Sequence, residues 1–330
     1  MNYRSIVDMN DAIVRNLHRL PRDIDLVVGI PRSGLLAATL FSLTANIPMT
    51  DLDSFLAGKT FSSGITKRRA ALDRAASEMR KILVIDDSIN GGTAMAGARA
   101  KVAAAGIDSE VIFAAVYGSY PQFKETDFIF EVVPWPRMFQ WNFMHHKFLT
   151  QSCVDIDGVL CVDPTDEEND DGPAYEGFLA SARPLYAPTR KIAYLVTSRL
   201  EKYRPQTEAW LAAQGIAYDK LIMLDLPSKE ARQRAAAHGS FKAEFYRASD
   251  AVLFIESECG QAVKIAELSG KPVLCLETHE MVLPGTTPLR ARLNQARTTD
   301  GRQAMLKSAA RSLLGEKGYE ALKRRVRKPA

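Results

Sequence analysis

The chain has 330 residues, of which 46% are hydrophobic and 25% charged, so it has the composition of a globular protein and the length of about two domains. No apolar run approaches the ~20 residues of a membrane-spanning helix, and the first residues lack a signal-peptide pattern, so we expect a cytoplasmic protein. The net charge of +4 is small and dispersed, which argues against nucleic acid as a partner.

Composition leaves two questions about partners open. The basic segment 323–328 is either a solvated helix face or a peripheral contact with an anionic membrane surface. A homo-oligomer remains one alternative for the assembly state. The four cysteines lack paired C-x-x-C spacing, which is typical of buried free thiols in a reducing compartment.

The first elements expected along the chain are a helix, a strand and a second helix. Apolar residues recur at spacings of three and four from Ile6 to Leu20, which predicts an amphipathic helix that ends before Pro21 and covers a sheet. Residues 25–30 then predict a buried strand. The turn Pro31-Arg-Ser-Gly34 leads from this strand into a helix over 35–43.

A second strand, turn and helix follow at 82–105. Residues 82–85 predict a strand buried on both faces, and the alanine-rich run 93–105 predicts a helix. Between them, the Gly91–Gly92 pair lets the backbone approach a phosphate at the helix N-terminus. The Asp86–Asp87 pair just upstream can accept ribose hydroxyls or hold Mg²⁺ through water. The stretch therefore predicts a sugar-phosphate site at the carboxyl edge of a sheet.

This stretch resembles the ribose-5-phosphate-binding signature of the type I phosphoribosyltransferases, enzymes that use phosphoribosyl pyrophosphate (PRPP). The family usually has threonine where this sequence has Gly91 and Ala94, with Thr93 one place early, so side-chain hydroxyls are depleted. The resemblance implies that 29–34 is the pyrophosphate loop. It also implies a set of PRPP-binding residues: Arg32, Ser33, Gly34, Lys67, Arg68, Asp86, Asp87, Ser88, Asn90, Gly91, Gly92 and Thr93.

The polar, basic segment 53–81 resembles the mobile catalytic loop of the same family. Cleavage of the C1–O bond of PRPP builds positive charge on the ribose and negative charge on pyrophosphate, so a closing cationic loop would stabilise the transition state and exclude water. Lys59, Lys67 and Arg68 are the candidates, with Lys59 as the catalytic one. A solvated surface loop is the alternative interpretation.

After a strand over 110–116 comes an aromatic stretch, residues 134–142. In the resembling family a variable region builds the pocket for the acceptor of the ribosyl group. Rings and amides can stack on and hydrogen-bond a ring-shaped acceptor. The acceptor candidates are Trp135, Arg137, Trp141 and Asn142. A plug between domains is an equally open interpretation.

A second constellation begins at 154–163, the sequence VDIDGVLCVD. Its D-x-D-G pattern resembles the first motif of the haloacid dehalogenase (HAD) superfamily. Residues i and i+2 at a strand end can both turn toward one metal, with one carboxylate attacking phosphorus and the other handling protons. The resemblance implies that Asp155 is the nucleophile and Asp157 the general acid/base.

The later motifs of that superfamily appear in order. The strand 192–196 ends in Thr197, which matches the phosphate-binding hydroxyl, and Lys242 suits the residue that neutralises the aspartyl-phosphate. The strand 251–255 is followed by Glu256 and Glu258, where the family more often has aspartates, and Glu256 is the first choice as metal ligand with Glu258 as a second. The implied Mg²⁺ ligands are Asp155, Asp157, Glu256 and Glu258.

These motifs predict an α/β protein with two doubly wound domains and mainly parallel sheets. We place a phosphoribosyltransferase-like domain at 1–148 and a HAD-like domain with C-terminal helices at 149–330. The intervals from Asp157 to Thr197 and from Thr197 to Lys242 are too short for a large cap domain. Superfamily members without a cap tend to accept bulky phosphorylated substrates.

Together, the two sites suggest sequential steps on one molecule. The first would transfer 5-phosphoribosyl from PRPP to an acceptor, preferably a sugar hydroxyl of a bacterial surface glycan intermediate, and the second would remove the 5-phosphate to leave ribofuranose. The pairing resembles fused phosphoribosyltransferase–phosphatase systems of polysaccharide biosynthesis. The alternatives are a nucleoside-like product from a heterocyclic acceptor, and a module that senses PRPP without chemistry beside a working phosphatase.

Overall fold

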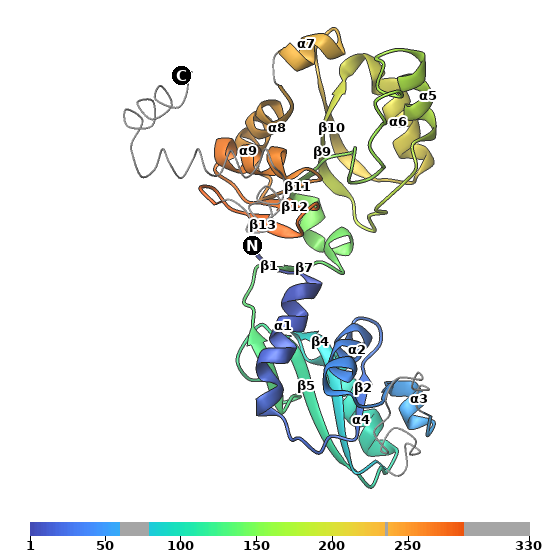
Figure 1. Cartoon of the computed structure of the whole chain (residues 1–330), viewed down its shortest axis with the longest axis vertical. Coiled ribbons are helices and arrows are strands. Elements are labelled where there is room, and N and C mark those ends of the chain that lie inside the picture. The colour runs from blue at the N-terminus through green and yellow to red at the C-terminus, as the bar shows by residue number, and fades with distance from the viewer. Residues whose placement is uncertain (60–78, 235–236, 287–330) are drawn as a thin grey trace, which may run out of the picture. The chain divides into compact units, whose positions relative to one another are not determined.

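In a computed structural model, residues 1–59, 79–234 and 237–286 are described (Figure 1). The chain divides into two compact units, the first ending at Phe143 and the second beginning at Met144. The boundary expected at 148/149 falls in a 3₁₀ segment, Lys147–Gln151, of the second unit. Within the described ranges, no helix is both long and apolar enough to cross a membrane. All four cysteines are free and buried, as expected.

The first unit is built on a five-stranded sheet in which every described pairing is parallel. A separate two-stranded parallel sheet joins the start of the chain to the aromatic stretch. The large sheet has the order β3 (Met49–Asp51), β2 (Leu26–Gly29), β4 (Lys81–Ile89), β5 (Glu110–Gly118), β6 (Phe128–Val132), and the small sheet pairs β1 (Asn2–Arg4) with β7 (Arg137–Phe139).

Helices cover both faces of the five-stranded sheet (Figure 1). Leu83 and Ile85 of β4 pack with α1 and α2, whereas Ile82 and Val84 pack with α3 and α4. Because successive strand side chains point to opposite faces, a sheet covered on both faces needs a continuous apolar run. The helices are α1 (Ile6–Asn16), α2 (Gly34–Ala45), α3 (Leu52–Leu56) and α4 (Thr93–Ala104).

The second unit has a six-stranded sheet, parallel except for its last strand. Its order is β10 (Tyr218–Leu224), β9 (Ile192–Leu200), β8 (Ser152–Val154), β11 (Leu253–Glu256), β12 (Val273–Cys275), β13 (Glu280–Val282). From β8 the chain adds β9 and β10 toward one edge of the sheet, and from β11 it adds β12 and β13 toward the other edge. The carboxyl ends of the neighbouring strands β8 and β11 therefore form the switch point where doubly wound sheets place ligands.

Helices also cover this sheet on two sides. Apolar side chains of α8 (Ala237–Ala248) and α9 (Cys259–Ser269) pack with Val196 and Phe254 on one face. Figure 1 shows α5 (Pro173–Ser181) and α6 (Arg204–Ala213) on the other side of β9 and β10, with α7 (Lys229–Arg234) at one end. The predicted fold class, α/β with two doubly wound and mainly parallel sheets, is confirmed.

One strand is longer than its apolar run indicates. The sequence places Asp86 and Asp87 after a strand ending at Ile85, but β4 continues to Ile89 because its backbone keeps pairing with β5 as far as Gly118. The two aspartates are therefore held in regular strand geometry. Gly34, at the start of α2, packs closely on this segment, since a β carbon there would lie 2.9 Å from the Ile85 carbonyl oxygen and from Asp86 Oδ1.

We expect Gly34→Ala to lower the free energy of unfolding of the first unit by about 1–3 kcal/mol, because the added methyl group meets strand backbone. Gly97→Ala is the matched control, since a β carbon on this α4 glycine has no neighbour within 4 Å and a gain of up to ~1 kcal/mol is expected from helix propensity. Urea unfolding of the full chain measures both. Equal midpoints for the two variants would contradict the close packing of Gly34.

Candidate active sites

The Asp86 site lies at the carboxyl end of β4, where three segments of the first unit meet. Asp87 Oδ1 accepts a hydrogen bond from Ser33 Oγ at 2.7 Å, and Asp87 Oδ2 accepts one from the Trp141 indole N–H at 2.8 Å. Asp86 Oδ1 accepts from the backbone N–H of Asp87 at 2.8 Å. The structure thus brings together Ser33, both aspartates and Trp141, which the sequence assigns separately to donor and acceptor binding.

The aromatic stretch also contacts the segment that follows the aspartates. The Trp135 indole N–H donates to Asn90 Oδ1 at 2.6 Å, and the buried Arg137 donates to the Ile89 carbonyl oxygen at 2.8 Å. Asn142 differs, because its Oδ1 accepts locally from the Phe139 N–H. Of the acceptor candidates, Trp135, Arg137 and Trp141 therefore touch the 86–90 segment, and Asn142 shapes the turn that carries Trp141.

The glycine turn leads directly into α4. Gly92 has φ +76°, a left-handed conformation that favours glycine, and a β carbon there would lie 2.9 Å from the Glu125 carboxylate. Gly91 and Thr93 are exposed, so the first turn of α4 is accessible to an anion.

The remaining donor-site candidates are less closely grouped. Ser88 is half-buried beside the aspartates, whereas Arg32 and Lys59 are exposed. Lys67, Arg68 and the basic segment 323–328 lie outside the described residues.

Two adjacent carboxylates in a buried strand cannot both ionise freely. Burial, together with the neighbouring Asp87, raises the pKa of Asp86 to about 8. Near neutral pH this carboxyl group therefore holds its proton much of the time unless a cation reaches it. A bound cation would favour the ionised form.

The pH dependence of stability tests this assignment with Asp86→Asn. The native state binds the Asp86 proton up to about pH 8, whereas the unfolded chain releases it near its ordinary pKa of about 4, so this group lowers stability as pH rises between those values. Relative to Asp86→Asn, the wild type should lose about 3–4 kcal/mol of unfolding free energy between pH 5 and pH 8. Urea unfolding across this range measures the difference, and parallel curves would contradict the raised pKa.

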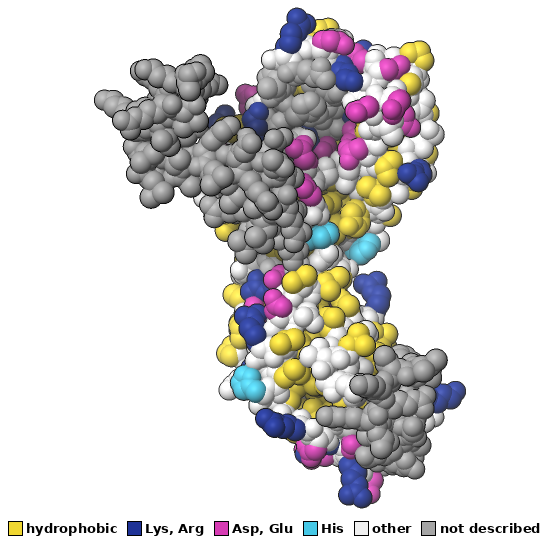
Figure 2. Space-filling model, viewed as in Figure 1, with side chains coloured by type: hydrophobic (Ala, Val, Ile, Leu, Met, Phe, Trp, Pro, Cys, Tyr) yellow, Lys and Arg dark blue, Asp and Glu magenta, His cyan; other side chains and the backbone are white. Residues whose placement is uncertain are grey.

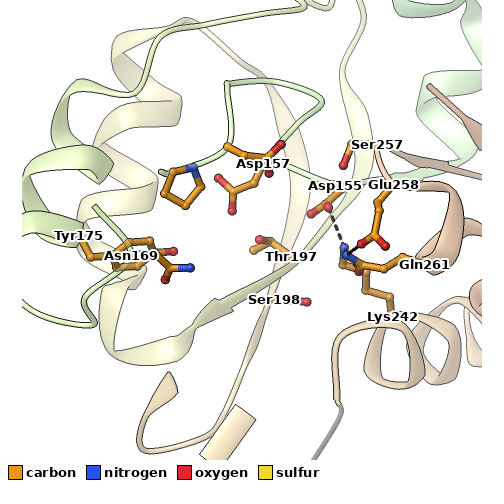
Figure 3. A pocket seen from close by; sticks show the side chains of 12 residues that line it. Asp155, Asp157, Asn169, Tyr175, Thr197, Ser198, Lys242, Ser257, Glu258 and Gln261 are labelled. Atoms are coloured by element: carbon orange, nitrogen blue, oxygen red, sulfur yellow. Dashed lines mark hydrogen bonds and ion pairs between the residues drawn. The ribbon is translucent and has the colours of Figure 1, made fainter. Parts of the chain in front are cut away.

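The Asp155 site is organised by a buried lysine (Figure 3). Lys242 Nζ, on α8, donates to Asp155 Oδ2 at 2.6 Å and to Glu256 Oε2 at 2.8 Å. Its third hydrogen bond goes to Gln261 Oε1 at 3.0 Å. A lysine ammonium has three protons, and all are used here. The cluster joins the ends of β8 and β11 to α8 and α9.

Asp157 and Thr197 face the same cavity and are both linked to Arg199, a residue that the sequence analysis did not select. Arg199 donates to Asp157 Oδ1 at 2.6 Å and to Oδ2 at 3.1 Å. Its backbone N–H donates to Thr197 Oγ1 at 3.2 Å. Burial opposes the charge of Arg199, but the Asp157 carboxylate outweighs this and raises the pKa of the guanidinium. The sequence offered one indication of this role, because Arg199 is a charged residue in an otherwise largely apolar strand, 192–200.

The cavity at this site has a volume of about 300 Å³ and acidic walls. Asp155, Asp157, Asp163 and Glu258 line it, and Lys242 is the cation among the described lining residues. Burial raises the pKa of Asp155, with Lys242 opposing and Glu256 adding to the rise. Burial and the neighbouring carboxylates also raise the pKa of Asp163. The surplus of negative charge suits a bound cation, particularly if a phosphate is to enter.

The two glutamates proposed as metal ligands differ in accessibility. Glu256 is fully buried, with Oε2 accepting from Lys242 and Oε1 from the backbone N–H of Ser257. Glu258 lines the cavity and accepts from Gln261. Within the described ranges, no group of three or more His, Cys, Asp or Glu side chains is arranged to hold a metal. Mg²⁺ often takes only one or two carboxylates and fills its other positions with water and phosphate oxygens, so Asp155 and Glu258 fit it.

Replacing Lys242 should lower the free energy of unfolding, because the buried carboxylates then lack a cation. Lys242→Met leaves Asp155 and Glu256 without their common cation, and we expect about 3–5 kcal/mol of lost stability in the second unit. Adding Glu256→Gln to this variant removes one buried charge and should restore part of the loss. Urea unfolding of the single and double variants gives the coupling energy. Additive effects would contradict a shared buried cluster.

Comparisons with known proteins give only distant similarities. No family model and no curated protein match the sequence. Among solved structures, the Helicobacter pylori xanthine-guanine-hypoxanthine phosphoribosyltransferase is 13% identical, with 43% of this chain and 92% of that chain covered and a TM-score of 0.29. The Pyrococcus horikoshii purine phosphoribosyltransferase is 17% identical, with 42% of this chain and 92% of that chain covered and a TM-score of 0.29. A Neisseria gonorrhoeae hypothetical protein with bound ppGpp is 14% identical, with 43% of this chain and 89% of that chain covered and a TM-score of 0.31. Similarity at this level says nothing about the activity of this chain.

Proposed function

We propose that this protein is a bifunctional enzyme that transfers a 5-phosphoribosyl group from PRPP to an acceptor and then hydrolyses the 5-phosphate. The observation that carries the proposal is the pairing of Asp155 with the buried Lys242 at a sheet switch point, beside Thr197 and Asp157. A buried lysine that orients a carboxylate at the edge of an acidic cavity fits an oxygen nucleophile for phosphorus.

In the transfer step, the 5-phosphate of PRPP would lie at the N-terminus of α4 and the ribose hydroxyls at Asp86 and Asp87. The acceptor oxygen attacks C1, pyrophosphate leaves with the electrons of the C1–O bond, and the proton of the acceptor hydroxyl passes to the departing pyrophosphate. Asp87 is already hydrogen-bonded to Ser33 and Trp141, so a ribose hydroxyl would replace the indole N–H as its donor. That exchange would free the Trp141 ring for the acceptor.

In the hydrolytic step, an oxygen of Asp155 attacks phosphorus and the ribose 5-oxygen leaves with a proton from Asp157. Water then attacks the aspartyl-phosphate, Asp157 takes a proton from that water, and inorganic phosphate leaves. Lys242 holds Asp155, the Thr197 hydroxyl binds a phosphoryl oxygen, and Arg199 orients Asp157. Mg²⁺, held by Asp155 and Glu258, would offset the negative charge of the substrate phosphate.

We infer that the acceptor is a sugar hydroxyl of a glycan intermediate, because a phosphatase would undo the product of nucleotide salvage but would complete a ribofuranosyl residue. A heterocyclic acceptor is the second candidate. It is favoured by the hydrogen bonds of the Trp135 and Trp141 indoles to Asn90 and Asp87, which bring two aromatic side chains to the 86–90 segment.

The two halves can be separated by following pyrophosphate and phosphate release from PRPP in the presence of Mg²⁺. A lipid-linked glycan and a panel of nucleobases serve as acceptors. Asp155→Asn should release pyrophosphate at the wild-type rate, lose phosphate release by roughly 10³-fold or more, and accumulate the 5-phosphorylated product. Asp87→Asn should instead abolish pyrophosphate release.

The acceptor that supports turnover distinguishes the two candidates. PRPP binding without turnover on any acceptor would replace the transferase with a sensing module. Phosphate release that survives Asp155→Asn would refute the nucleophile.

A further inference from the structure

A second cavity opens beside the Asp155 cavity in the second unit. Its volume is about 570 Å³, within the usual range for small-molecule sites. It shares Asp163 and Ser257 with the Asp155 cavity, so a molecule whose phosphate reaches Asp155 can extend into it without leaving the protein surface. Its other walls include Val162, Leu185, Tyr186, Leu276 and Glu277.

Both walls are fixed to the segments that carry the catalytic candidates. On one side, Leu185 N–H donates to the Leu160 carbonyl at 2.8 Å and Val162 N–H to the Arg183 carbonyl at 3.0 Å. These bonds hold the strap 183–186 against the turn that follows Asp157. On the other side, Leu276 N–H donates to the Glu256 carbonyl at 2.9 Å, and Glu277 N–H to the Ser257 carbonyl at 3.1 Å. The second cavity is therefore positioned by the same backbone as the first.

The chemistry of the walls selects against anions. Asp163 and Glu277 supply carboxylates, and His279 is the titratable nitrogen base among the lining residues. These residues, all in the described part of the chain, contain no lysine or arginine. A second phosphate or a carboxylate on the substrate would meet like charge there. On the side of the second unit turned toward the viewer in Figure 2, Asp and Glu side chains gather with hydrophobic side chains nearby.

The same walls suit a neutral ring that carries hydroxyls. Carboxylates accept hydrogen bonds from sugar hydroxyls. The half-buried Tyr186 ring and the leucine side chains give an apolar surface for the C–H face of such a ring. A purely apolar chain would offer no hydrogen-bond donor to Asp163. Glu277 accepts from the Cys259 N–H at 2.9 Å and keeps further acceptor capacity, so mixed polar and apolar walls favour a saccharide over a lipid.

We propose that this cavity binds the neutral sugar unit to which the phosphorylated ribose is attached, and so selects glycoside 5-phosphates as substrates of the Asp155 site. The inference rests on the proposed phosphatase function. The ribose would lie at the junction formed by Asp163 and Ser257, with its 5-phosphate toward Asp155 and the next ring against Tyr186.

The test measures kcat and KM of the full chain with Mg²⁺ on four synthetic phosphomonoesters. Methyl ribofuranoside 5-phosphate is the small reference, and a ribofuranosyl glucoside 5-phosphate adds one neutral ring. The matching glucuronide adds the same ring with a carboxylate, and octyl ribofuranoside 5-phosphate adds an apolar chain. We expect the glucoside to exceed the reference about tenfold in kcat/KM, mainly through KM, and the glucuronide and octyl compounds to lack most of this gain.

Tyr186→Ala should remove the gain on the glucoside without changing the rate on methyl ribofuranoside 5-phosphate, and Tyr186→Phe should keep it. Three results would overturn the saccharide site while leaving the phosphatase in place. The first is an equal rate on the reference and the glucoside, and the second is an equal gain on the octyl compound. The third is an equal loss on all substrates in Tyr186→Ala. Failure to hydrolyse any of the four would overturn the phosphatase itself, and the site with it.

Discussion

The contact on which the second unit depends is the buried ammonium of Lys242 between the carboxylates of Asp155 and Glu256. Removing three charged groups from water is costly, and their mutual attraction offsets that cost only when all hydrogen bonds are made. Here each proton of Lys242 has an acceptor, and the three acceptors lie just after β8, at the end of β11 and on α9. The cluster can form only if β8 and β11 are neighbours, so the strand order and the site geometry require each other.

The first unit handles buried charge differently. Asp86 and Asp87 are adjacent in a strand, and within the described residues their hydrogen-bond donors are a backbone N–H, a hydroxyl and an indole rather than a lysine. The buried Arg137 lies near enough for Asp87 to favour its charge, yet burial lowers the pKa of Arg137 and its hydrogen bond goes to a carbonyl oxygen. The pair therefore keeps a preference for an incoming cation or hydroxyl donor. No salt bridge to either aspartate is formed within the described residues, which suits a ligand that comes and goes. Asp155, by contrast, is held permanently by its ion pair with Lys242.

Much of this arrangement was predictable because parallel strands bring their carboxyl ends to one edge. Asp155, Thr197 and Glu256 each follow or end an apolar run, so their convergence follows from strand type alone. The contacts that define their roles were not predictable. Arg199 reaches Asp157 across 42 residues and Trp141 reaches Asp87 across 54, and neither pairing has a local spacing rule. The extension of β4 through two aspartates could not be predicted either. The apolar run ends at Ile85, but backbone hydrogen bonds to β5 continue the strand beyond it.

The two proposed activities share one chemical difficulty. PRPP carries the same 5-phosphate that the second unit would remove, so a phosphatase that did not discriminate between PRPP and the transfer product would destroy the donor. The acidic walls give a physical answer. PRPP has a pyrophosphate on C1, and in the Asp155 site that group would point along the ribose toward Asp163 and Glu277, where like charge disfavours it. After transfer, C1 carries a neutral sugar instead, and the repulsion is gone. On this view the acidic second cavity makes hydrolysis wait for transfer, because the charge on C1, rather than the phosphate itself, is what distinguishes donor from product.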